Sequence, residues 1–295
     1  MATDDHNARA ITVSTPLSNR VLTTASALLS TKKGLLSVVI LAPILVFSFA
    51  APVLAPYDPT ATHIIDKFAA PGGEYLLGTD DYGRDLLSRV LYGGRSSIII
   101  GLSSTALGLL FGVPLGIFSG YLGGRFDEVV MRLMDTLFSF PSLLLALLVV
   151  TGLGSGLVNT ILAIGVVFTP GIARITRSST LSVINEEYIT AAEARGESLF
   201  RIAFREILPN VSSAILVEAS IRIGFGILIG TSLSFLGLGT QPPFPDWGYM
   251  ISSSRSHLHD SIWFMLWPGL ALGLTIMGFN LLGDALRDVI DPEGQ

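Results

Sequence analysis

The residues best suited to chemistry are few, and most of them lie outside the long apolar stretches. Glu218 and Arg222 are the exception, because they stand four residues apart in an apolar run long enough to cross a membrane. This spacing puts both side chains on one helix face, with the acidic residue first, which favours an ion pair. Ionisable groups inside a membrane are usually functional, so the pair is a candidate site. A structural pair facing the bundle interior is the alternative interpretation.

The other chemistry-bearing residues give little support for catalysis or metal binding. The chain has no cysteine, which excludes disulfides and cysteine nucleophiles. His257, His259 and Asp260 form an H-x-H-D pattern that suits nickel or zinc, but two histidines alone do not make a site. The chain also has no G-x-x-x-x-G-K-[ST] phosphate-binding loop. We therefore expect no catalytic residue, no metal and no cofactor in this chain.

The composition indicates an integral membrane protein. Half of the 295 residues are hydrophobic and only 14% are charged, with a mean hydropathy of +0.63. Soluble domains carry about a quarter charged residues, so this chain is too apolar for water. The net charge is −5 and the basic residues are scattered, which gives no sign of a nucleic-acid partner.

Apolar stretches predict an all-α protein with six membrane-spanning helices, since a span needs about 20 apolar residues. The charge-free run 136–173 is too long for one span, and the glycine-rich residues 151–156 divide it into two. The ambiguous residues 234–262 leave five or seven spans open. The apolar stretches are 34–57, 96–124, 136–173, 212–236 and 262–283.

The basic residues predict that both chain ends are cytoplasmic. Twelve of the 18 lysines and arginines then fall in cytoplasmic segments, five fall in outer segments and Arg222 lies in a span. The predicted organisation is a cytoplasmic tail (1–33), a first span (34–57), an outer loop (58–95), a five-helix core (96–283) and a cytoplasmic tail (284–295).

A glycine stripe and one proline shape the predicted helices. Gly108, Gly112, Gly116 and Gly120 repeat every four residues, which favours close packing against another helix over a pore-lining role. Pro141 lies inside the predicted third span, where it should kink the helix or mark an irregular start.

The cytoplasmic residues 185–208 are the most informative stretch, because they are polar yet patterned. Asn185 is a suitable N-cap for a first helix that Gly196 ends. Ser198 caps a second helix, and Pro209 follows it. The pattern predicts two short amphipathic helices. Their apolar face either packs under the bundle or enters a groove on a soluble partner, and both alternatives stay open.

This stretch resembles the EAA loop of ABC importer permeases, whose pattern is E-A-A-x3-G-x9-I-x-L-P. Thr190 stands where the motif has Glu, and Glu206 stands where it has Ile, with Ile207 next to it. In that family the loop forms coupling helices that dock into the ATPase subunit. The resemblance implies an ATPase-coupling role for Ala191, Ala192, Glu193, Gly196, Leu199, Phe200, Ile207, Leu208 and Pro209.

Four further stretches resemble the permeases of dipeptide, oligopeptide and nickel transporters, in particular the subunit with the short outer loop. These stretches are 77–97, 120–147, 234–248 and 283–292. The resemblance implies a type I ABC importer permease fold in a prokaryotic inner membrane. It also implies four kinds of partner: a second homologous permease, two ATP-binding subunits or one fused ATPase chain, an extracytoplasmic solute-binding protein and the lipid bilayer.

The implied function is ATP-driven import of di- or oligopeptides by alternating access, with ATP and Mg²⁺ bound by the partner ATPases. Nickel or another small solute is the alternative cargo, and an ion-driven secondary transporter is a further alternative. An intramembrane serine protease is disfavoured, because no serine and base lie together at depth. Gln241, Pro242, Asp246 and Trp247 lie in a stiff outer loop and are candidates for docking the binding protein.

Overall fold

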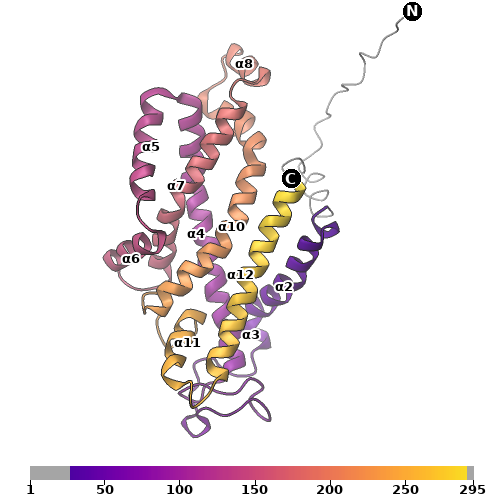
Figure 1. Ribbon diagram of the computed structural model, residues 1–295, viewed down its shortest axis with the longest axis vertical. Coiled ribbons are helices and arrows are strands. Elements are labelled where there is room, and N and C mark those ends of the chain that lie inside the picture. The colour runs from indigo at the N-terminus through magenta and orange to yellow at the C-terminus, as the bar shows by residue number, and fades with distance from the viewer. Residues whose placement is uncertain (1–26, 291–295) are drawn as a thin grey trace, which may run out of the picture.

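The computed structural model describes residues 27–290, which form an all-helical bundle (Figure 1). The predicted N-terminal tail up to residue 26 and the last five residues of the C-terminal tail lie outside the described residues. The helices are α2 (Lys32–Phe49), α3 (Ala51–Leu54), α4 (Leu86–Leu122), α5 (Gly124–Phe138), α6 (Ser142–Leu153), α7 (Leu157–Val183), α8 (Glu187–Ala194), α9 (Leu199–Arg201), α10 (Leu208–Phe235), α11 (Trp247–Ser254) and α12 (Trp263–Ile290).

Five long helices and one bent pair give five or six candidate membrane spans. Helices α2, α4, α7, α10 and α12 are each long and apolar enough to cross a membrane. The pair α5–α6 bends by 92° and has the geometry of a broken span or a re-entrant loop, and it is the sixth span if it crosses. It reaches the far end of the bundle, because Gly156 N donates to Leu238 O beyond the end of α10. Helix α11 has eight residues, too few to span, so residues 234–262 add no further span and seven spans are not supported.

The third span is not the single helix expected from residue 136. Helix α5 begins at Gly124, and α6 starts after a break at Pro141. Proline lacks an N–H group and disfavours helical geometry in the residue before it, which explains the break. The charges in α5 do not end that helix, because Asp127 pairs with Arg177 of α7 at 2.5 Å. The prediction that Pro141 marks an irregular start is confirmed.

Two helices extend beyond the predicted spans. The last ten residues of the predicted outer loop 58–95 are helical, because α4 starts at Leu86, where Asp85 accepts a hydrogen bond from Ser88 N at 2.7 Å. Arg89 stays in this helix because the carboxylate of Asp80 lies 3.1 Å away.

At the other end of the chain, α12 continues to Ile290, past the predicted end of the last span at residue 283. Lys33 of α2 bonds Asp288 at 2.8 Å, so the first part of the predicted tail 284–295 is helical and packed against α2.

Helices α4 and α7 form the tightest seam of the bundle. The stripe Gly108, Gly112, Gly116 and Gly120 faces α7, and the interpretation as close packing is confirmed. A Cβ atom added at Gly116 would lie 2.5 Å from the carbonyl oxygen of Ala173, a distance that side chains do not tolerate. The seam therefore depends on glycine at this position.

The bundle has two distinct ends (Figure 1). Helix α8, the start of α2 and the end of α12 lie at one end. Helices α3 and α11, with the loops beside them, lie at the opposite end. This is the arrangement that the basic residues predict, with the segment 185–208 on the same side as both described chain ends.

Candidate coupling surface

We call residues 185–208 the coupling segment, and its first helix matches the expectation closely. Helix α8 starts at Glu187 with Glu186 as N-cap, one residue later than the predicted cap Asn185. Gly196 ends it with a positive φ of 71°, a conformation that glycine adopts without steric cost. The predicted stop at Gly196 is therefore confirmed.

The second predicted helix is not separate from the span that follows. After α9, residues Ile202–Ile207 form a π-helical turn, η2, that continues directly into α10. Pro209 lies in the first turn of α10 and does not end a helix, contrary to expectation. A proline removes one i→i−4 hydrogen bond, and a wider π-turn just before it accommodates the ring. The coupling segment is thus joined rigidly to α10.

One face of the coupling segment packs under the bundle. Ala192 and Ile207, two of the coupling candidates, are fully buried and do not touch a partner in this conformation. Their neighbours come from the ends of α4 and α10, and the apolar contacts fix the segment to both helices. The buried cluster comprises Ile117, Ile189, Ala192, Ile202, Ala203, Ile207, Val211 and Ile215.

The opposite face is exposed and carries most of the other coupling candidates. The side chain of Phe200 is 65% exposed and meets the ring of Phe118 edge-on, with 5.6 Å between centroids. Glu193 accepts a hydrogen bond from the hydroxyl of Tyr121 at 2.8 Å. Ala191, Glu193, Gly196, Phe200 and Pro209 are exposed, and Leu199 and Leu208 are partly buried.

Two α4 residues in these contacts, Phe118 and Tyr121, were not candidates in the sequence. They lie about 70 residues before the coupling segment, as in the Tyr121–Glu193 contact with its separation of 72 residues. No local pattern connects positions so far apart, so only the folded chain reveals them.

Charged side chains near Gly196 also form ion pairs beside the exposed face. Glu197 forms ion pairs with Arg195 at 2.9 Å and with Arg201 at 3.2 Å, which connect the end of α8 to α9 across Gly196. Burial raises the pKa of Tyr188 above its usual value. These contacts together hold a surface of small, aromatic and paired charged residues in place at one end of the bundle.

The predicted contact between Glu218 and Arg222 is present inside α10. Arg222 Nε donates to Glu218 Oε1 at 2.5 Å. The guanidinium lies 5.2 Å from the ring centroid of Phe168 and covers Gly171, where a Cβ atom would lie 2.2 Å from Arg222 Nη2. The pair therefore faces α7 inside the bundle.

The outer-loop candidates divide into two groups. Gln241 and Pro242 are exposed. Asp246 and Trp247 are buried, at 0% and 1% exposure, so neither touches a docked protein in this conformation. Asp246 accepts from Gly248 N at 2.9 Å and caps α11, while Trp247 donates to a backbone carbonyl of α4. Burial raises the pKa of Asp246 to about 6.

The H-x-H-D pattern contains one weak internal contact. His257 Nδ1 lies 3.2 Å from Asp260 Oδ2, and His259 is exposed. Among residues 27–290, no three His, Asp or Glu side chains lie close enough together to hold a metal ion.

Sequence comparisons agree with this architecture. Residues 112–293 match the family model described as "Binding-protein-dependent transport system inner membrane component". The "Di/tripeptide transport system permease protein DppC" of Pseudomonas aeruginosa is 41% identical over 268 residues, which cover 88% of each chain. The "Glutathione transport system permease protein GsiD" of Pectobacterium atrosepticum is 41% identical over 251 residues, or 85% of this chain and 83% of that one.

A solved structure supports the fold. The inward-facing MetNI methionine ABC transporter matches with a TM-score of 0.55 at 18% identity, covering 68% of this chain and 96% of that chain. The family model covers more than half of the chain, and the relatives cover most of it. The chain therefore belongs to the binding-protein-dependent inner membrane components, as a permease subunit of a bacterial ABC importer that works with ATPase and solute-binding partners.

Proposed function

We propose that this permease imports di- or oligopeptides, and that the exposed face of the coupling segment receives the motion of the ATPases. The observation that carries the coupling role is the two-sided packing of α8 to η2: one face is buried under the bundle and the other is open. The names of the two relatives, which include di- and tripeptide and glutathione transport, support peptidic cargo.

The geometry suits direct transmission of force. A push on α8 reaches α4 through the buried contact with Ile117 and reaches α10 through Val211 and Ile215. Because η2 continues into α10 without a break, displacement of the coupling segment also moves α10 as one body. Alternating access then follows when α4, α7 and α10 rock against a partner and change the side on which the pathway opens.

The partners in this proposal are a second homologous permease, two ATP-binding subunits or one fused ATPase chain, and a binding protein at the outer end. The bent pair α5–α6 presents an exposed apolar face that fits the second permease or lipid, including Val129, Leu133 and Leu144. Gln241 and Pro242 remain available for contact with the binding protein.

Uptake by the reconstituted complex tests the cargo. The tagged permease is purified with its copurifying subunits, placed in vesicles that contain ATP, and supplied with binding protein and radiolabelled dialanine. We expect ATP-dependent uptake that excess unlabelled dipeptide suppresses. Suppression by Ni²⁺ or glutathione alone would assign a different cargo, and uptake without ATP would support an ion-driven carrier.

A further inference from the structure

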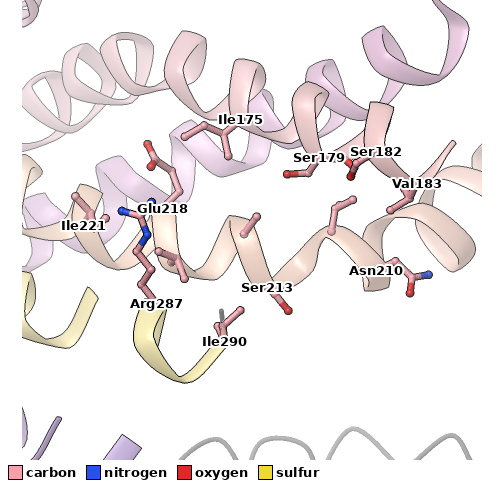
Figure 2. A pocket seen from close by; sticks show the side chains of 13 residues that line it. Ile175, Ser179, Ser182, Val183, Asn210, Ser213, Glu218, Ile221, Arg287 and Ile290 are labelled. Atoms are coloured by element: carbon pink, nitrogen blue, oxygen red, sulfur yellow. The ribbon is translucent and has the colours of Figure 1, made fainter. Parts of the chain in front are cut away.

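Each member of the ion pair of α10 lines a different cavity. The first, about 510 Å³, lies between α7, α10 and the last turns of α12 (Figure 2). It runs from Asn210, next to the coupling segment, to Ile221 in the middle of α10, about 16 Å at 1.5 Å per residue. The second, about 360 Å³, lies under the α5–α6 bend and is lined by Pro141 and Arg222. The ion pair stands at the boundary between them.

The walls of the first cavity are mixed, with polar and charged groups between apolar side chains such as Ile175 and Val217. Ser179 and Ser182 from α7, with Ser213 from α10, place hydroxyl groups along it. Figure 2 shows the side chain of Arg287 rising from α12 into the cavity toward Glu218. Helix surfaces in contact with lipid tails are apolar, whereas charged groups at depth face protein or water-filled space. This cavity therefore fits a solute path better than a lipid-facing groove.

The two members of the ion pair face different cavities. Glu218 lines the first cavity and Arg222 lines the second. Their side chains are 14% and 23% exposed, so a solute can reach both. Within residues 27–290, the contact uses Nε of Arg222 and Oε1 of Glu218. This contact leaves Arg222 Nη1 and the second carboxylate oxygen of Glu218 for a ligand, whereas Nη2 packs against Gly171.

We propose that Glu218 and Arg222 separate to hold the two charged ends of a peptide, an inference that rests on the proposed peptide import. Glu218 accepts hydrogen bonds from the terminal ammonium group, and Arg222 donates to the terminal carboxylate. An extended dipeptide spans about 7 Å. Side chains four apart on a helix start about 5–6 Å apart and here point into separate cavities, so the lengths match.

The exchange keeps Glu218 and Arg222 paired. Without cargo, the two side chains neutralise each other, so neither is a lone charge inside the bundle, where it would be costly. With cargo, one ion pair is replaced by two. The same movement opens the boundary between the cavities, so passage is linked to the presence of both peptide ends.

Three peptides test the proposal in the complete reconstituted transporter: dialanine, N-acetyl-dialanine and dialanine amide, each at a concentration that saturates the binding protein. Uptake by Glu218→Gln and by Arg222→Gln is divided by wild-type uptake for each peptide. Preferences of the binding protein cancel in this ratio. The exposed pair Glu128 and Arg132 has the same spacing and a 2.7 Å contact, so Glu128→Gln is the matched control.

We expect Glu218→Gln to lower uptake of dialanine and dialanine amide about tenfold more than uptake of the acetylated peptide, equivalent to about 1.4 kcal/mol. Arg222→Gln should spare the amide instead. Glu128→Gln should match wild type for all three peptides. ATP hydrolysis stimulated by loaded binding protein should stay within about twofold of wild type in both cavity variants.

Equal losses for the three peptides would overturn the inference and leave a structural pair. Losses that depend on anionic lipid in the vesicles, and not on the peptide ends, would assign the first cavity to a lipid headgroup and also overturn it. If the wild-type complex transports no dialanine, the proposed function itself is wrong, which separates the two failures.

Discussion

At the residue scale, two adjacent alanines of α8 have opposite environments. Ala191 is exposed, whereas Ala192 is fully buried against the bundle. The motif identified both positions from the sequence but not which of them faces a partner. That distinction depends on Ile117 of α4, which packs over one side of the helix and is distant in sequence.

The exposed alanine gives a clean test of docking. Ala191→Arg should lower recovery of the ATP-binding subunit with the tagged permease about tenfold, because a long cation replaces a flat contact. The thermal midpoint of the permease should not change, since the buried cluster is untouched. Ala70→Arg is the matched control, being exposed at the opposite end of the bundle. Equal recovery from both variants would refute the docking role.

The raised pKa of Asp246 predicts that the stability of the protein depends on pH. Its pKa is about 6 in the folded protein against 3.8 for the free side chain, so its stabilising contribution is complete below about pH 4 and is lost as the pH rises through about 6. The loss is on the order of 3 kcal/mol. Asp246→Asn keeps the acceptor for Gly248 N and removes the charge.

The stability of the Asp246→Asn variant should therefore rise relative to wild type between about pH 4.5 and about pH 7. The measurement is the thermal midpoint in detergent across this range, taken as the difference between variant and wild type because other groups titrate as well. A difference that does not change with pH would contradict this assignment.

At the scale of elements, charge was a poor guide to where helices end. Helix α4 starts ten residues before the predicted second span, and α12 continues seven residues past the predicted last span. In both cases a partner outside the helix neutralises the charge: Asp80, in the loop before α4, pairs with Arg89, and Lys33 of α2 pairs with Asp288. The lengths of the apolar stretches predicted that α4 and α12 exist. The positions of their ends also depend on ion pairs with residues outside each helix.

The glycine seam between α4 and α7 supplies the prediction at this scale. Gly116→Ala should destabilise the permease by about 1–3 kcal/mol, because the added methyl group meets the backbone of α7. Gly269→Ala in α12 is the control, since a Cβ atom there meets nothing within 4 Å. Thermal unfolding in one detergent compares the two. Equal midpoints would show that the seam opens at little cost.

At the scale of the whole molecule, the bundle links two functional regions through α10. The coupling segment runs into the start of this helix, and the ion pair between the two cavities lies in its middle. The family and the span count could be predicted from the sequence, because motifs and apolar length are local. The cavities could not, because the first forms between α7, α10 and α12 and the second between the α5–α6 bend, α7 and α10, which are separated by long stretches of chain.

The central claim is that the exposed face of the coupling segment contacts an ATPase. The natural absence of cysteine makes a direct test possible, since Ala191→Cys creates a unique attachment site for a thiol-linked photocrosslinker. Ala70→Cys at the outer end is the matched control. After illumination of membranes that contain the whole transporter, we predict an adduct between position 191 and an ATP-binding subunit, and no such adduct from position 70. Absence of that adduct at position 191, or equal adducts from both positions, would contradict the account.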